Sequence, residues 1–123
     1  MRRTLFLVFV AVAAAAGQTM SCPESITVAK TEHRFERVNI YNGKQGAEEY
    51  DLAPDDEKTV GRTIVQTWLL KDYRSMNLFM RCRYHDTEVT RSMDLPAPLQ
   101  TCTFTFEMRK DGTIVGKSVV VCR

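Results

Sequence analysis

The carboxy-terminal part of the chain, residues 78–122, constrains the fold most strongly. Within residues 102–108 the side chains of Cys102, Phe104, Phe106 and Met108 alternate with Thr and Glu. A period of two residues is that of a half-buried β-strand. Similar strands are predicted at residues 25–30, 35–41, 63–70, 76–84, 89–93 and 114–122. The sequence therefore predicts an all-β protein, a small antiparallel sheet, sandwich or barrel of about six to eight strands, stapled by disulfides.

The first 21 residues predict a secretory signal peptide. Two arginines precede an apolar run over residues 5–12, and small residues suitable for cleavage follow at 13–17. A membrane anchor would need about 18 or more apolar residues, and the polar residues from Gln18 onward end the run too early. We therefore expect residues 1–21 to be removed and residues 22–123 to form a single β domain.

The expected location is the periplasm or the exterior of the cell. A lipoprotein acylated at Cys22 is the alternative, but the usual aliphatic residue three positions upstream of that cysteine is absent, since Thr19 stands there. Loss of the leader lowers the count of Lys and Arg from 17 to 15, which equals the 15 acidic residues. A neutral mature chain gives no electrostatic reason to expect nucleic acid as a partner.

Four cysteines in a short exported chain favour disulfide bonds over a metal site. Zinc sites use closely spaced ligands such as Cys-x-x-Cys, whereas these cysteines are about twenty or more residues apart in the sequence. A two-residue turn at Asp111-Gly112 would place Cys102 opposite Val121 and turn Cys122 to the other face. We therefore expect the pairs Cys82–Cys102 and Cys22–Cys122. A longer turn with a bulge would shift this register.

An acidic segment follows a predicted turn at Asn42-Gly43 and occupies residues 44–61. It has little apolar content and is predicted to be the longest irregular loop of the mature chain. A calcium site would need carboxylates in an ordered spacing with a glycine at the sharp turn, and the segment lacks that spacing. The alternatives are a solvated loop and a loop that recognises a protein partner. The candidate partner-binding residues are Glu48, Glu49, Asp51, Asp55, Asp56 and Glu57.

No motif for catalysis or for a cofactor is found. The chain has no Gly-x-Ser-x-Gly, no Gly-rich phosphate loop and no His-Glu-x-x-His. His33 and His85 lie in polar stretches and are predicted to be surface residues, while Trp68 is predicted to belong to the core. The sequence therefore favours a binding module over an enzyme and predicts neither a catalytic residue, a metal nor a cofactor.

Several short motifs occur along the mature chain in the order Cys22-Pro23, the strand at 25–30, Tyr41-Asn42-Gly43, Leu52-Ala53-Pro54-Asp55, Gln66-Thr67-Trp68, Cys82-Arg83-Tyr84, Leu95-Pro96 and Cys102. This order resembles an uncharacterised family of small exported proteobacterial proteins known by an enterobacterial locus tag. Members are similar to proteins found near type VI secretion genes, and some look like periplasmic immunity proteins that block a peptidoglycan-cutting effector. The resemblance implies a protein partner of that kind.

The leading hypothesis is a periplasmic immunity protein that binds and inhibits a toxin or hydrolase acting on the cell wall. A rigid scaffold with one charged segment complementary to a cleft is what such an inhibitor needs. The alternatives are a protein similar to lysozyme inhibitors and a structural accessory protein of the cell envelope.

Overall fold

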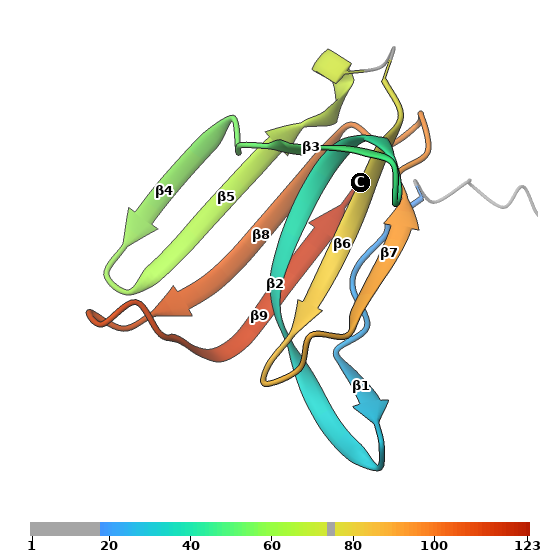
Figure 1. The fold of residues 1–123 in the computed structure, drawn as a ribbon. Coiled ribbons are helices and arrows are strands. Elements are labelled where there is room, and N and C mark those ends of the chain that lie inside the picture. Colours follow the sequence, from blue (N-terminus) through green and yellow to red (C-terminus); the bar gives the residue numbers. More distant parts are fainter. Residues whose placement is uncertain (1–17, 74–75) are drawn as a thin grey trace, which may run out of the picture.

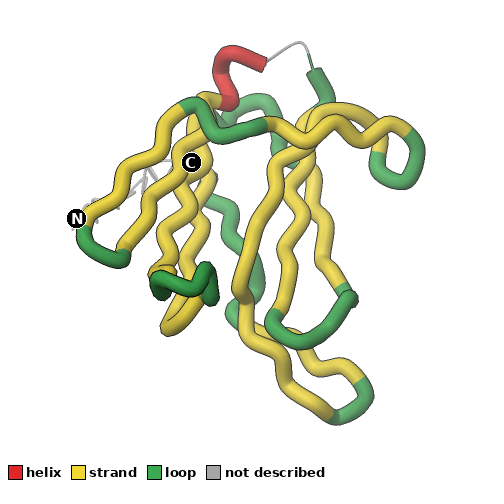
Figure 2. The backbone as a smooth tube through the Cα atoms, turned by 60° about the vertical axis from the view of Figure 1, so that its left-hand side comes forward, coloured by secondary structure: helices red, strands yellow, loops and turns green. Residues whose placement is uncertain are grey.

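Alternating apolar side chains give most of the strands one face for a shared core, and two antiparallel sheets pack with these faces together (Figures 1 and 2). The structure is a computed structural model, and it describes residues 18–73 and 76–123. The arrangement of two sheets around one core is that of a β-sandwich.

The larger sheet has five strands in the order β1-β2-β6-β7, with β3 also paired to β2. The long strand β2 pairs with β1 near its start, with β3 near its end, and with β6 along most of its length. The strands are β1 (Ser25–Val28), β2 (Thr31–Lys44), β3 (Glu48–Leu52), β6 (Leu78–Tyr84) and β7 (Thr90–Asp94).

The smaller sheet has four strands in the order β4-β5-β8-β9. The chain enters it when β3 leads across one end of the sandwich to β4, and it leaves by a short 3-10 turn, η1 (Figure 1). These elements are β4 (Asp56–Val60), β5 (Thr63–Leu69), η1 (Leu70–Tyr73), β8 (Thr101–Met108) and β9 (Ile114–Cys122).

The all-β, disulfide-stapled prediction is confirmed, but the described residues form nine strands where six to eight were expected. The predicted irregular loop over residues 44–61 is wrong, because it contains β3 and β4. The predicted turn at Asn42-Gly43 is also wrong: both residues lie in β2, and the turn follows it. Nearly all side chains of β3 and β4 are exposed, so these strands lack the alternation that would have identified them.

The core joins the inner faces of both sheets. Trp68 is 3% exposed and its indole N–H donates a hydrogen bond to the carbonyl of Leu52 at 2.8 Å, so the predicted core role of Trp68 is confirmed. Phe35 of β2 and Phe104 of β8 pack edge to face across the two sheets, with ring centroids 5.9 Å apart. On β8, the predicted inward face of Cys102, Phe104 and Phe106 is buried.

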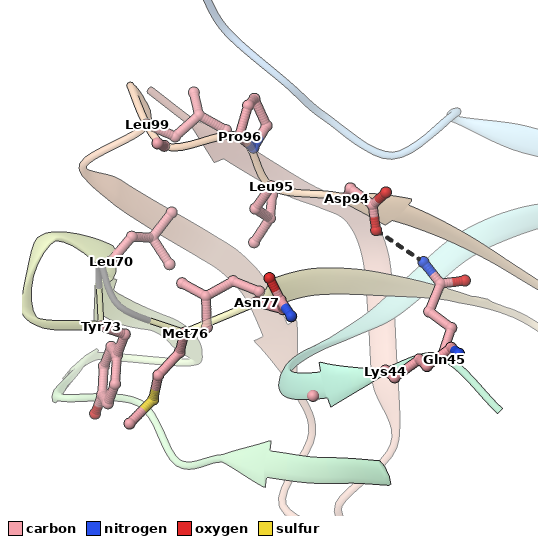
Figure 3. Close-up of a pocket in the computed structure, with 13 residues that line it drawn as sticks. Lys44, Gln45, Leu70, Tyr73, Met76, Asn77, Asp94, Leu95, Pro96 and Leu99 are labelled. Carbon is pink, nitrogen blue, oxygen red and sulfur yellow. Dashed lines mark hydrogen bonds between the residues drawn. The ribbon is translucent and has the colours of Figure 1, made fainter. Parts of the chain in front are cut away.

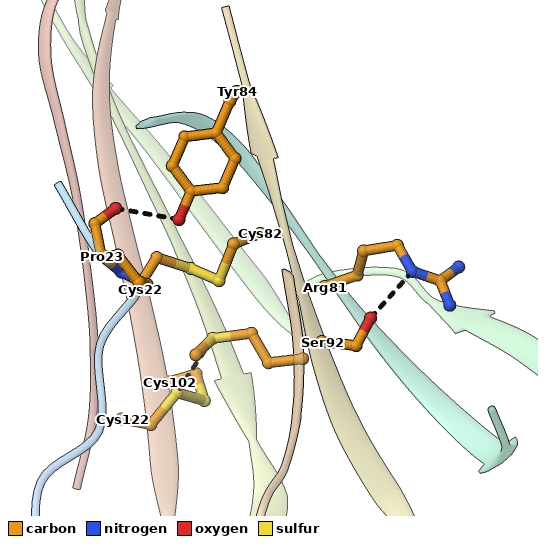
Figure 4. The surroundings of a disulfide bond; sticks show 9 residues. Cys22, Pro23, Arg81, Cys82, Tyr84, Ser92, Cys102 and Cys122 are labelled. Atoms are coloured by element: carbon orange, nitrogen blue, oxygen red, sulfur yellow. Dashed lines mark hydrogen bonds between the residues drawn. A yellow bond between two sulfur atoms is a disulfide. The ribbon is translucent and has the colours of Figure 1, made fainter. Parts of the chain in front are cut away.

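All four cysteines form disulfides, but the predicted pairing is wrong. The pairs are Cys22–Cys82 and Cys102–Cys122 (Figure 4). Cys102 and Cys122 are directly opposite in the ladder between β8 and β9, with Cα atoms 4.0 Å apart. The sulfur of Cys122 also lies 3.8 Å from that of Met80, so the two cystines belong to the centre of the core.

A bulge explains the error in the predicted register. Between Thr105↔Val119 and Glu107↔Val115 the strand β8 advances by two residues while β9 advances by four. Gly116 in this bulge has a φ of +69°, which glycine adopts without steric cost. The hairpin loop is also longer than the two-residue turn that was expected, since Met108↔Ile114 is its last pair. Together these changes bring Cys122 to the same face as Cys102.

The amino-terminal segment is tied to the end of the last strand, though by the backbone and not by a cystine. Met20 and Cys122 exchange two hydrogen bonds of 2.8 Å. Cys22 then reaches β6 through its disulfide, and the hydroxyl of Tyr84 donates to the carbonyl of Pro23 at 3.0 Å. Of the predicted signal peptide, residues 1–17 lie outside the described part of the chain. In the part that is described, no helix is long and apolar enough to cross a membrane.

Candidate partner-binding surface

The six acidic residues proposed for partner binding form a band at one end of the sandwich. Glu48, Glu49 and Asp51 belong to β3, at the margin of the five-stranded sheet. Asp55 precedes β4, and Asp56 and Glu57 begin that strand at the edge of the four-stranded sheet. The structure therefore brings them to neighbouring edges of the two sheets (Figure 1).

Several of these carboxylates have partners within the chain. Asp55 accepts a hydrogen bond from the backbone N–H of Leu69 at 2.7 Å, and Glu57 accepts one from Gln66 at 2.7 Å. Asp51 lies 3.5 Å from the side-chain amide of Asn39. Glu48 and Asp56 are exposed and have no side-chain hydrogen bond to any other described residue.

Glu49 forms an ion pair with Arg81 of β6. The Arg81 guanidinium donates to both carboxylate oxygens of Glu49, one at 3.1 Å, in a bidentate pair. These hydrogen bonds, with a further one from the backbone N–H of Gly46, hold the pKa of Glu49 below its ordinary value. The same pair raises the pKa of Arg81. Glu49 thus joins β3 to β6 across the intervening strand β2.

Two stacked aromatic rings lie on the outer face of the five-stranded sheet. Tyr41 and Phe79 stack with centroids 5.1 Å apart, and they are only 9% and 1% exposed although they do not belong to the core between the two sheets. The guanidinium of Arg81 lies over both rings, 5.0 Å and 5.6 Å from their centroids. Its Nε donates to Ser92 of β7 at 3.1 Å, on the side of β6 opposite the disulfides (Figure 4). Cation–π contact and hydrogen bonds therefore hold this arginine in one orientation.

A pocket of about 790 Å³ opens at the end of the sandwich near the acidic band (Figure 3). Leu70, Leu95 and Leu99 form its apolar wall, while Gln45 donates a hydrogen bond to Asp94 at 3.2 Å on its rim. The described lining contains no serine, histidine or cysteine. The pocket can accept an apolar side chain of a partner.

The two histidines lie at the opposite end of the five-stranded sheet. His85 contacts the carboxylate of Glu36 at 2.5 Å, and Nδ1 of His33 lies 2.7 Å from the carbonyl of His85. Both rings are at least partly exposed, in agreement with the prediction. In residues 18–73 and 76–123 the His, Cys, Asp and Glu side chains form no group that could hold a metal ion.

Sequence reasoning proposed the acidic residues and kept the exposed side of the strand with Arg81 and Arg83 as the next candidate, but it missed the aromatic rings beside these arginines. In the sequence of β6, Arg81 and Arg83 alternate with Met80, Cys82 and Tyr84, which predicts that the two arginines face away from the core. Neither Tyr41 nor Phe79 was predicted to lie on that face. The signal was available in the phase of β6, because Phe79 is two residues from Arg81 and must point the same way.

Comparisons with known proteins agree with the resemblance seen in the sequence. Residues 29–123 match the family described as type VI secretion system Tli immunity protein. An uncharacterized 16.3 kDa protein in the trpG 5′ region of Azospirillum brasilense is 30% identical over 140 residues, covering 95% of this chain and 93% of that protein. No solved structure matches the chain. Because the match extends over nearly the whole described β-sandwich, the chain belongs to the type VI secretion system Tli immunity protein family.

Proposed function

We propose that this protein is a periplasmic immunity protein that binds a toxin delivered by type VI secretion and thereby protects the cell envelope. Family membership supports the immunity role. The cell wall is the target that we propose for the toxin. Membership of this family favours immunity over the alternatives of a lysozyme inhibitor and a structural accessory protein.

The two buried disulfides are the observation that supports the proposed periplasmic location. Both cystines lie in the core, where Cys82, Cys102 and Cys122 are completely buried. Disulfides persist in oxidising compartments and are rare in the cytosol of most cells. An immunity protein must be folded where it meets its toxin, so the toxin is expected to act outside the cytoplasm.

The disulfide at Cys22 also bears on the lipoprotein alternative. Acylation of a lipoprotein cysteine uses its thiol sulfur, and here that sulfur is bonded to Cys82. One sulfur cannot serve both purposes. We therefore propose a soluble periplasmic protein that is released from its leader.

The proposed contact surface includes the acidic band. Glu48, Asp51 and Asp56 are exposed and would meet a basic cleft of the toxin, while Glu49, Asp55 and Glu57 also hold β3 and β4 in place. Complementary charges of this kind accelerate association in a salt-dependent manner. The pocket next to the band offers room for an apolar anchor.

A protection experiment tests the proposal. Host cells would produce a type VI effector in their periplasm, together with either the full chain or residues 18–123 without a leader. We expect the full chain to restore growth and the leaderless chain, which stays in the reducing cytoplasm, to fail. Equal protection by both forms would contradict a periplasmic site of action.

The class of toxin is tested in the same cells with two sets of effectors. Protection against an effector that degrades peptidoglycan supports the proposed wall target. Protection only against effectors that cleave membrane lipids would retain the immunity role but overturn the wall target. Failure to protect against any type VI effector would contradict the proposed function as a whole.

A further inference from the structure

Two arginines lie opposite each other on the outer face of the five-stranded sheet. Arg37 of β2 and Arg83 of β6 are directly opposite each other in the ladder. Side chains in such positions have Cβ atoms about 4.5–5.5 Å apart, and like charges placed there destabilise a sheet.

Neither arginine is neutralised as Arg81 is. Arg83 donates from Nε to the Asn39 side chain at 2.7 Å and from Nη2 to the Tyr41 hydroxyl at 3.0 Å, and both acceptors are neutral. Its Nη1 has no hydrogen bond to another described residue. Arg37 is 53% exposed, and its nearest carboxylate, at 3.6 Å, is that of Glu36, which His85 also contacts.

Arg83 is held in place against the two stacked aromatic rings of the sheet. The Tyr41 hydroxyl that receives Arg83 belongs to the ring stacked on Phe79, and Arg81 covers both rings. Arg and Tyr are enriched among residues that dominate the binding energy of protein interfaces. Side chains already fixed in their bound orientation lose little conformational entropy when a partner docks.

We propose that this face of the sheet is the toxin-docking surface, and that Arg37 and Arg83 together receive a carboxylate, an Asp or Glu side chain, of the toxin. The proposal rests on the immunity function proposed above and names the contact through which it operates. A carboxylate between the two guanidinium groups would remove their repulsion and could accept hydrogen bonds from both.

The surrounding charges favour a single acidic side chain over a polyanion. Glu49 and Asp51 of β3 and Asp94 of β7 are carried on the same face, nearer the opposite end of the strands. A nucleic acid or an anionic lipid surface laid along the sheet would be repelled by these carboxylates. A protein partner can instead place an acidic group at the arginine end and basic groups at the acidic band.

Charge reversal tests the proposal, with a neighbouring arginine as the control. The variants are Arg37→Glu, the double change Arg37→Glu with Arg83→Glu, and Arg34→Glu, which changes an exposed arginine on the same strand. The probe is a catalytically inactive form of the effector against which the full chain protects. We expect Arg37→Glu to weaken binding about ten-fold or more and the double variant to weaken it further, with Arg34→Glu within about two-fold of the parent.

Two measurements separate an effect on folding from an effect on docking. Arg37→Glu removes a like-charge contact at an exposed position, so its melting temperature should equal or exceed that of the parent. If the double variant does not fold, the binding of the single variant Arg37→Glu tests the proposal by itself. An Asp→Lys or Glu→Lys change in the effector should restore binding to Arg37→Glu specifically.

Two results would overturn the proposal. The first is that a folded Arg37→Glu variant binds the effector and protects cells as well as the parent does. The immunity function would then stand, and only the proposed docking surface would be wrong. The second is that the parent binds vesicles of anionic lipid and the Arg37→Glu variant does not. The arginine pair would then bind lipid phosphate groups and not a carboxylate of the toxin.

Discussion

At the scale of single residues, two adjacent aspartates of the acidic band have different roles. Asp55 accepts a hydrogen bond from the Leu69 N–H at 2.7 Å and lies 3.5 Å from the Tyr73 hydroxyl, whereas Asp56 makes no such contact with another described residue. We expect Asp55→Ala to lower the free energy of unfolding by about 1 kcal/mol, the usual net value of a hydrogen bond. Asp56→Ala should leave it almost unchanged. Chemical denaturation of both variants checks this, and equal stabilities would mean that Asp55 does not anchor β4.

Glu49 predicts a pH dependence of stability. Its pKa is lowered in the folded protein, chiefly by the hydrogen bonds from Arg81. A lowered pKa means that the stabilisation is present above the unfolded value and is lost as the pH falls through the folded value. The parent should therefore exceed Glu49→Gln in melting temperature at neutral pH, and the difference should shrink as the pH falls below 4.5, the ordinary value for glutamate.

The neighbouring residue Glu48 provides the control for this measurement. It lies on the same strand, and its side chain makes no hydrogen bond to another described residue. Glu48→Gln should give a melting curve that follows the parent at every pH. A pH-independent difference between the parent and Glu49→Gln would show that the carboxylate charge is not what joins β3 to β6.

At the scale of elements, the disulfides make different contributions. Cys22–Cys82 closes a separation of 60 residues and Cys102–Cys122 one of 20. The chain-entropy relation assigns them about 4 and about 3 kcal/mol respectively. Replacing Cys22 and Cys82 by Ala should therefore lower the melting temperature more than replacing Cys102 and Cys122.

Thiol labelling separates this pairing from the one predicted from the sequence. After replacement of Cys82 and Cys102 by Ala, the structure leaves two unpaired thiols, at Cys22 and Cys122. The sequence-based pairing would leave none, because Cys22 and Cys122 would be bonded to each other. Labelling of the denatured protein by a thiol reagent, without reductant, distinguishes the two.

At the scale of the whole molecule, the bridge between Met20 and Cys122 predicts where the proposed leader would be removed. Met20 exchanges two backbone hydrogen bonds of 2.8 Å with Cys122, next to the Cys102–Cys122 cystine. A cut after Ser21 would remove that residue from the fold. We therefore expect cleavage before Met20, close to the small residues 13–17. The intact mass of protein purified from the periplasm measures this directly, and a mass that begins at Cys22 would contradict it.

Much of the sandwich was determined by the sequence alone, because inward and outward side chains alternate on its central strands. Residues such as Phe104 and Met80 reveal their burial by their positions in that pattern. The pattern fails for β3 and β4, whose side chains are nearly all exposed. Their strand structure comes from backbone pairing with β2 and β5 and is independent of side-chain polarity.

The tertiary structure alone decided the disulfide pairing and the composition of the candidate surface. A bulge at Gly116 shifts the register of β9 and brings Cys122 opposite Cys102. The outer face of the larger sheet combines Tyr41, Phe79 and the arginines from strands almost forty residues apart in the chain. Period and composition act over neighbouring residues, so they specify which way a side chain points. Only the pairing of distant strands specifies what it meets there.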